Sequence, residues 1–410
     1  MTLVDQNPAP SAAPEPASSR RPAITGNPWL PTPGGVWLVT GIELRRRRPT
    51  AKGWIFYGLL LAIILGLGIL LAVVSGGEKT SMPMELVLVL VLGAGMLIAP
   101  SLAATSINGD SSEGVLAPLQ MTRLTAGDLA LGKLLASWLI AVVVLLTMTP
   151  FLVYAFTRSG WHWDELLIVI GVILLVVLTS TAIGLAWSAI AARAVASVSL
   201  AHLTTGALLL GTLLAFVFTQ PLVSETVTDQ SRYVDYESLT DEQRTAYENW
   251  DWSEVDPSTL PCMTDQNPYE YGVAHTERTA WLLLSNPVVL IGESSPIISY
   301  DTWEEDGRAA PGLFAEMHRW VSDSRIGPSE ADLAGEQWDE CAMLVAEYNG
   351  DAYNGGNGDW EAEQEANSVY PRAPWIGLGV QGILLLGSLW IVVARLRVPY
   401  VKLRQGSRVA

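Results

Sequence analysis

The chain has 410 residues, half of them hydrophobic, and a formal net charge of −17. Residues 223–372 hold 31 Asp and Glu against 7 Lys and Arg, whereas the rest of the chain has a balance of +7. This separation excludes a single globular domain of average composition, and it indicates an apolar, mildly basic part interrupted by an acidic, water-soluble one. We expect no nucleic-acid partner.

The first predicted elements precede the membrane. Residues 1–34 are rich in Pro, Ala and Ser and lack the apolar core of a signal peptide, so we expect a disordered cytoplasmic tail. Residues 35–52 are predicted to form an elbow helix in the membrane interface, in contact with lipid. Its apolar side would carry Trp37, Leu38 and Ile42, with Glu43, Arg45 and the other arginines largely elsewhere. The alternative is a plain basic flank of the first span.

Six apolar stretches are long enough to cross a membrane, which takes about 20 helical residues. They cover residues 54–74, 86–104, 134–156, 166–191, 195–222 and 375–394. The predicted fold class is an all-α membrane protein with six transmembrane helices, five within residues 53–222 and the sixth within 373–397. Lys and Arg concentrate before the first span and after the last. Both termini, including the tail at 398–410, are therefore predicted to be cytoplasmic, and a bacterial plasma membrane fits.

The cytoplasmic loop between the second and third spans carries the most informative motif. A charged turn is followed by a short helix with spaced leucines, and Gly-Lys then opens the third span. This pattern resembles the inner loop of ABC-2 type transporter permeases, and the elbow is similar to that family's elbow helix. The resemblance covers about residues 27–222 and 373–408. The matching loop positions are Glu113, Gly114, Leu116, Leu119, Thr122, Leu124, Asp128, Leu129, Gly132 and Lys133.

The resemblance implies a function and partners. Residues 105–128 would be a coupling loop that docks on a separate ATPase subunit, and the chain would pair with a second permease subunit, identical or not. ATP and Mg²⁺ would be bound by the ATPase, so this chain would be no enzyme and would need no cofactor of its own. Leu116 and Leu119 would face either the partner or the adjoining spans. The alternative is an ordinary amphipathic connecting loop.

Residues 127–133 imitate part of a phosphate-binding loop. Leu134 stands where Ser or Thr would hold Mg²⁺, and a transmembrane helix follows without a preceding strand. We therefore reject an ATP site here, and we expect Lys133 to extend to the lipid headgroups.

The acidic domain at 223–372 is predicted to be extracytoplasmic and mainly helical or irregular. Helices are expected at 240–252, 311–321 and 329–348. Residues 280–298 are apolar but broken by prolines, which favours an interfacial or re-entrant segment over a seventh span; a buried helix-turn in the core is the alternative.

Few polar residues of the sequence point to a site outside the loop. Cys262 and Cys341 both lie in the outer domain, where they would form a disulfide or remain two buried thiols. Residues 351–365 fail the EF-hand pattern, and the four histidines have no metal-binding spacing. His202 lies inside the fifth span, where it would line a pathway or make a simple bond between helices.

We therefore expect the membrane-spanning subunit of an ATP-binding-cassette exporter. A receptor or assembly platform that binds a partner through its acidic domain is the alternative. An intramembrane enzyme is disfavoured, because no carboxylate pair, metal triad or Ser/His dyad is found at matching depth.

Overall fold

The computed structural model describes residues 29–47, 80–120, 122–265, 268–296, 309–329, 338–350 and 371–397, with isolated positions between them. The predicted tail at 398–410 and the acidic stretch at 351–365 lie wholly outside the described residues. The predicted tail at 1–34 and the first predicted span at 54–74 lie mostly outside them.

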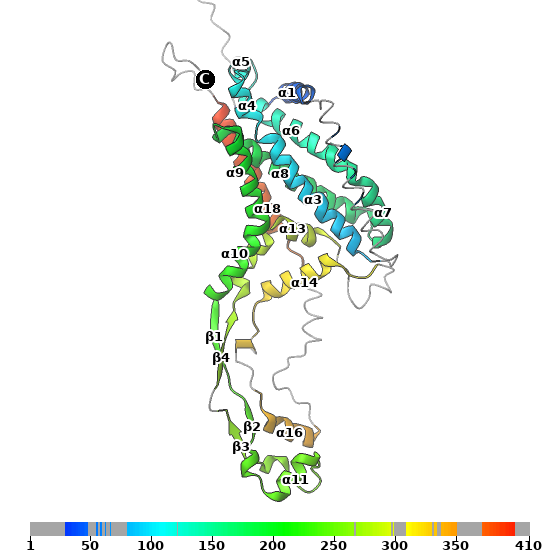
Figure 1. Cartoon of the computed structure of the whole chain (residues 1–410), viewed down its shortest axis with the longest axis vertical. Helices are drawn as coiled ribbons and strands as arrows, with labels where there is room; N and C mark the ends of the chain where they lie inside the picture. Colours follow the sequence, from blue (N-terminus) through cyan, green and yellow to red (C-terminus); the bar gives the residue numbers. More distant parts are fainter. Residues whose placement is uncertain are drawn as a thin grey trace, which may run out of the picture.

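Long apolar helices dominate the described part of the chain (Figure 1). Five of them are long and apolar enough to cross a membrane: Met82–Ser112, Ala126–Ser159, Trp163–Ile190, Ala194–Leu222 and Pro374–Leu396. They overlap the predicted second to sixth spans, but Met82–Ser112 and Ala126–Ser159 extend into the predicted coupling loop at 105–128. The expectation of a mainly helical chain with several candidate membrane spans is therefore confirmed.

The bundle consists of several helical segments, some of which join end to end. The elbow region forms α1 (Pro33–Arg46), and span six is α18 (Pro374–Leu396). Between them lie α3 (Met82–Ala103), α4 (Ser106–Ser112), α5 (Leu116–Gln120), α6 (Ala126–Leu145), α7 (Thr149–Ser159), α8 (Trp163–Ile190), α9 (Ala194–Gly206), the π-helical η2 (Ala207–Gly211) and α10 (Thr212–Thr219).

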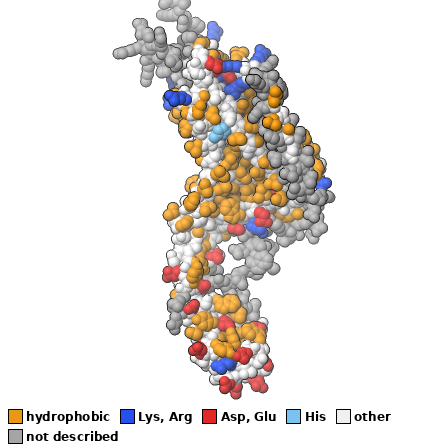
Figure 2. All heavy atoms as spheres, in the orientation of Figure 1, with side chains coloured by type: hydrophobic (Ala, Val, Ile, Leu, Met, Phe, Trp, Pro, Cys, Tyr) orange, Lys and Arg blue, Asp and Glu red, His pale blue; other side chains and the backbone are white. Residues whose placement is uncertain are grey.

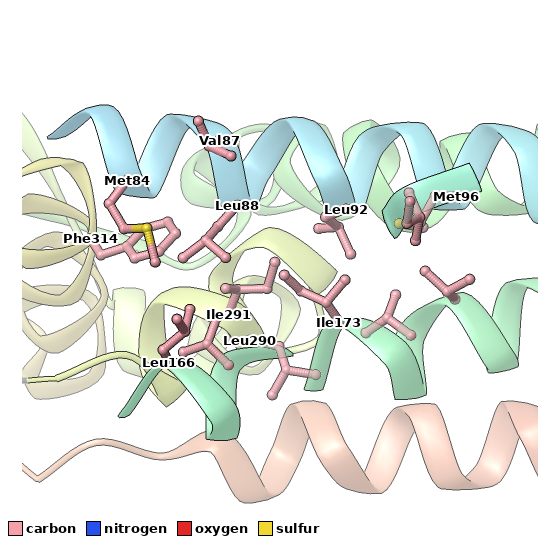
Figure 3. Packing of buried hydrophobic residues seen from close by; sticks show 14 of the residues in the cluster. Met84, Val87, Leu88, Leu92, Met96, Leu166, Ile173, Leu290, Ile291 and Phe314 are labelled. Carbon is pink, nitrogen blue, oxygen red and sulfur yellow. The ribbon is translucent and has the colours of Figure 1, made fainter. Parts of the chain in front are cut away.

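The largest apolar core lies between α3 and α8. Figure 3 shows Leu88 and Leu92 of α3 facing Ile173 of α8. Glycine allows this close approach, because a Cβ on Gly95 would lie 2.4 Å from the Val177 side chain. Small residues of this kind favour helix packing inside membranes.

The acidic domain at 223–372 begins with strands that extend from the bundle as a narrow ribbon. β1 (Ser224–Asp229) pairs antiparallel with β4 (Tyr269–Ala274), and β2 (Arg232–Val234) pairs with β3 (Cys262–Thr264). With α11 (Asp241–Asn249) and α16 (Glu340–Asn349), the second pair forms a distal lobe at the far end of the molecule (Figure 1). Figure 2 shows acidic side chains on this lobe, and most of the visible basic ones at the opposite end of the molecule.

The predicted helices of the outer domain differ in accuracy. α11 begins at the predicted Thr240 cap, and α14 (Leu313–Ile326) starts two residues later than expected and runs further. The helix predicted at 329–348 is not continuous: Ser329 accepts from the Asp332 amide at 3.1 Å as the predicted cap and residues 332–333 are helical, but a separate helix begins at Glu340. Trp338 is not helical, because its carbonyl accepts a strand-like bond from the Arg232 amide, and Asp339 then caps α16.

The apolar segment at 280–298 forms two short helices, α12 (Ala280–Leu284) and α13 (Pro287–Ser294). They pack between α10, α14, α18 and the outer part of α8 rather than forming a further long helix. Figure 3 shows Leu290 and Ile291 of α13 between α3 and α8.

Candidate functional site

The loop between α3 and α6 folds into two short helices joined by a tight turn. Gly114 in this turn has φ of +73°, a conformation that L side chains rarely adopt. A Cβ at Gly114 would meet nothing within 4 Å, so backbone conformation rather than space requires glycine here. The Val115 amide donates to the Asp110 carbonyl at 2.9 Å and closes the end of α4.

The third span begins at a capping box that also holds the elbow. The Thr125 hydroxyl accepts from the Asp128 amide at 3.0 Å, and Asp128 Oδ2 accepts from the Thr125 amide at 2.9 Å. Asp128 Oδ1 accepts from the Thr32 amide, 2.5 Å away, at the start of α1. A Cβ on Gly132 would lie 2.5 Å from Val39, so glycine lets α1 lie directly against α6. The family-like positions Asp128 and Gly132 therefore join the elbow to the third span.

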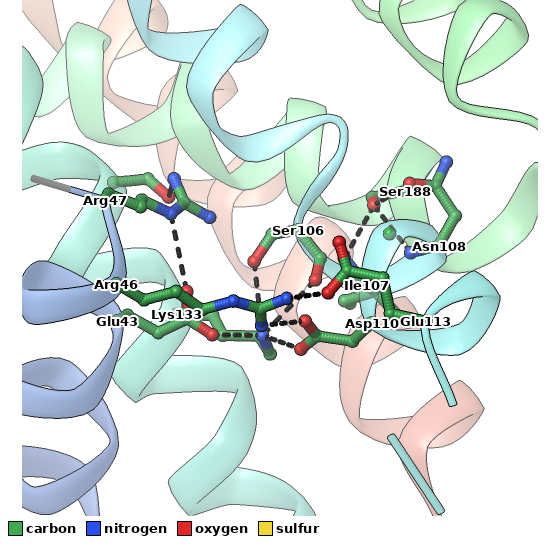
Figure 4. A network of polar contacts seen from close by, with 12 residues as sticks. Glu43, Arg46, Arg47, Ser106, Ile107, Asn108, Asp110, Glu113, Lys133 and Ser188 are labelled. Atoms are coloured by element: carbon green, nitrogen blue, oxygen red, sulfur yellow. Dashed lines mark hydrogen bonds and ion pairs between the residues drawn. The ribbon is translucent and has the colours of Figure 1, made fainter. Parts of the chain in front are cut away.

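A buried ion cluster lies where α1, α4 and α6 meet (Figure 4). Lys133 of α6 is 0% exposed, and its ammonium donates to carboxylates of Glu43 on α1 and Asp110 on α4. Its Nζ also lies 3.3 Å from the Ser106 carbonyl. The expectation that Lys133 extends to the headgroups is wrong, because two buried carboxylates neutralise it inside the protein.

Two arginines of the elbow complete this ion cluster. Arg46 pairs with Asp110 and, on the exposed side, with Glu113. Arg47 lies 3.4 Å from Glu43 and donates to the Leu102 carbonyl at 2.7 Å. The hydrogen bond to Asp110 raises the pKa of the Arg46 guanidinium, although burial opposes it. Three basic and three acidic side chains thus balance one another.

The energetic consequence of this ion cluster is asymmetric. A balanced buried pair adds little net stability, but removing one partner leaves an uncompensated buried charge and costs roughly 3–5 kcal/mol. The cluster therefore fixes the relative positions of α1, α4 and α6 more strongly than it adds to overall stability.

The opposite side of α4 is fixed by amide and hydroxyl groups. Asn108 Nδ2 donates to Ser197 Oγ of α9 at 2.8 Å, and the Ile107 amide donates to Ser188 Oγ of α8 at 2.9 Å. Ser197 Oγ in turn donates to the Ala104 carbonyl at 2.5 Å. α4 is therefore bonded to α6, α8 and α9 and, through the ion cluster, to α1.

Every residue of the turn at 111–115 is exposed. Leu116, Leu119 and Leu124 are partly buried against the apolar core formed by α1, α6, α8 and α18. Of the two alternatives left by the sequence, the leucines therefore contact the adjoining spans. Thr122 is exposed and donates to the Leu119 carbonyl at 2.7 Å.

A polar hollow of about 340 Å³ opens beside the ion cluster. Residues from α1, the inner end of α3, α4 and α6 line it, including Arg47, Ser101, Thr105 and Ile140. The hollow belongs to the same site, because Glu43, Arg46, Asp110 and Glu113 also face it.

The elbow residues separate into an exposed and a buried set. Trp37, Leu38 and Ile42 are 65%, 57% and 48% exposed, so they are free to contact lipid. Arg45 is exposed as well. Glu43 is only 5% exposed and belongs to the ion cluster, which the helical pattern alone did not predict.

The remaining predicted residues lie away from this loop. His202 is partly exposed, and its Nε2 lies 2.9 Å from Ser101 Oγ of α3, which is the bond between helices that the sequence left open. Cys262 and Cys341 form a disulfide in the distal lobe. Within the described ranges, no group of three or more His, Cys, Asp or Glu is placed to hold a metal ion.

Sequence reasoning missed Arg46, Arg47 and Asp110 as members of the site. A usable signal existed, because Asp110 and Lys133 are charged residues at the ends of apolar stretches that are predicted to lie on the same side of the membrane, where each would need a counter-charge. Compared with known proteins, the chain matches no family model and no curated protein. The resemblance to ABC-2 permeases therefore depends on the residues named above.

Proposed function

We propose that this chain is the membrane-spanning permease subunit of an ATP-binding-cassette exporter, driven by a separate ATPase that supplies ATP and Mg²⁺. The observation that carries the proposal is the buried ion cluster of Lys133, Glu43 and Asp110. It makes α1, α4 and α6 one unit with the exposed turn at 111–115. A force applied to that turn would reach the third span and the elbow together.

The proposed topology has six spans, both termini in the cytoplasm of a bacterial cell and the acidic domain outside. Five candidate spans among the described residues support it, together with the segregation of charge to opposite ends of the molecule (Figure 2). Labelling of single cysteines in intact cells tests this topology. Ser258→Cys in the distal lobe should react with an impermeant maleimide, and Ser112→Cys should react only after the membrane is opened.

The substrate class follows from the character of the spans. Each candidate span has a high mean hydropathy. Most of the buried polar residues in these spans carry a hydroxyl group rather than a charge. A lipid-like, peptide or amphipathic substrate suits such a surface better than an ion. A second permease subunit, identical or different, would complete the path.

The proposal is tested by purifying the full chain from its native membrane. We expect an ATP-binding-cassette ATPase to co-purify. The double variant Glu113→Ala, Gly114→Asn should lose the ATPase while keeping the thermal stability of the span bundle, because Glu113 is exposed and asparagine tolerates the positive φ of Gly114, where no atom lies within 4 Å of a Cβ. Arg123→Ala, an exposed change in the same loop, is the matched control. Undiminished ATPase association in the double variant would exclude this coupling surface.

A receptor or assembly platform is the second candidate. It is favoured by the distal lobe, which a two-stranded ribbon holds away from the bundle (Figure 1). A native assembly that contains an extracellular partner and no ATPase would support this alternative.

A further inference from the structure

The fifth span is interrupted by a π-helical segment. η2 joins α9 to α10, and the Thr212 amide donates to the Ala207 carbonyl five residues before it. A π-turn inserts an extra residue, bends the helix axis and leaves a carbonyl without its α-helical donor. Figure 1 shows α10 inclined to α9 at this point.

Two side chains supply donors at this point: the Thr212 hydroxyl of the span itself, which donates to the Leu208 carbonyl at 3.0 Å, and a buried amide from another part of the chain. Asn286, at the start of α13, is 0% exposed. Its Nδ2 donates to the Leu209 carbonyl at 2.7 Å, and it also lies 2.9 Å from Thr212 Oγ1 and 3.3 Å from the Leu208 carbonyl. The side chain is therefore inserted into the hydrogen-bond ladder of the fifth span at η2.

This contact lies deep in the span. Leu209 precedes Leu222, the outer end of the span, by thirteen residues, which corresponds to roughly 20 Å along a helix. Unpaired backbone carbonyls are strongly unfavourable at such depth, because lipid offers no donors. The bent form of span five therefore depends on side-chain donors, one of which is brought in from outside that helix.

Asn286 belongs to a group of short helices, α12 to α14, that is bonded to other spans. Its own Oδ1 accepts from the Val288 amide at 2.8 Å and caps α13. At the other end of α13, Glu293 accepts from the Ala373 amide in front of α18 at 2.8 Å and pairs with buried His318 of α14. Glu85 of α3 accepts from the Phe314 amide of α14 at 3.0 Å. Helices α13 and α14 thus connect spans two and six to span five.

We propose that Asn286 is a positioning residue that holds the fifth span bent at η2. The inclination of α10 is then set by Asn286 at the start of α13 together with Thr212 of the span, and not by the span alone. This inference does not depend on coupling to an ATPase, since it concerns the geometry of one span.

The test measures the end-to-end distance of span five. Spin labels at Val195→Cys and Leu222→Cys, whose side chains are 79% and 82% exposed, are introduced into the full chain in lipid nanodiscs. Asn286→Ser keeps a capping oxygen for α13 but removes the amide. We expect the distance to move towards the roughly 40 Å of a straight helix of that length, or the distribution to broaden.

Two further measurements separate this effect from general damage. A label pair at Asp164→Cys and Ile190→Cys on α8 should report the same distance in wild type and variant. Thr212→Val leaves α13 untouched but removes both an acceptor of Asn286 and the hydroxyl that donates to the Leu208 carbonyl, so it should shift the span-five distance in the same direction. If Asn286→Ser does not fold, Asn286→Asp, which keeps the capping oxygen but has no amide donor, decides the question. A wild-type distance distribution in each folded variant would overturn the proposal.

Discussion

Replacing Lys133 with Met tests the buried ion cluster most severely. The ammonium of Lys133 is 0% exposed and bonded to two carboxylates, Glu43 and Asp110, which are 5% and 3% exposed. Met fills nearly the same volume but leaves both carboxylates with one cation fewer. Loss of one partner of a buried pair costs roughly 3–5 kcal/mol. We expect Lys133→Met to lower stability by that amount.

The assay is the unfolding of the purified full chain in detergent, followed by circular dichroism with increasing denaturant. Arg123→Met, an exposed change in the same loop, should change stability by less than about 0.5 kcal/mol. Adding Glu43→Gln to Lys133→Met restores the charge balance and should recover part of the loss, because the two residues are in contact. If Lys133→Met behaves like Arg123→Met, then Lys133 is hydrated and the ion cluster does not hold the loop.

Three further predictions concern other parts of the chain. Gly114→Ala should cost roughly 1–2 kcal/mol of local stability, because the alanine must adopt φ near +73°; faster hydrogen exchange at 113–116 would show this, and unchanged exchange would contradict it. Tyr247 is bonded to Glu340, which raises its pKa to about 12. Since the folded lobe favours the protonated phenol, this bond stabilises the lobe fully below about pH 10, and the stabilisation is lost as the pH rises through about 12. A titration followed by tyrosinate absorbance should therefore lose a group that titrates near pH 12 in Tyr247→Phe. Reduction of the Cys262–Cys341 disulfide, whose residues are 79 apart in sequence, should destabilise the distal lobe by roughly 4.5 kcal/mol on the chain-entropy model. Exchange should then accelerate in β2, β3 and α16 but not in α8, and uniform acceleration would refute the separation of lobe and bundle.

The spans were predictable because the signal is large and local. A run of about 20 apolar residues has few other stable environments, and the helices at 82–103, 163–190 and 374–396 follow such runs closely. Capping boxes are equally local, and the start of α11 at Thr240 was predicted from one. The box at Thr125 has the same local pattern, but it was overlooked, and the third span was expected to begin at residue 134.

The ion cluster was not predictable in the same way. Glu43 and Lys133 are 90 residues apart, and an isolated lysine at the end of a span usually extends to the headgroups. Its burial depends on Asp110 from a third element, and pairing of this kind has no local pattern. The start of α16 was missed for a similar reason, because a distant strand residue, Arg232, holds Trp338 in an extended conformation.

The most direct test of the proposed coupling is site-specific photo-crosslinking in native membranes. A photoreactive residue at Ser112, in the exposed turn at 111–115, should form an adduct with an ATP-binding-cassette ATPase, and the same residue at the exposed Ser258 of the distal lobe should not. An intact, membrane-inserted chain that yields no ATPase adduct from Ser112, or yields it from Ser258 instead, would contradict the account.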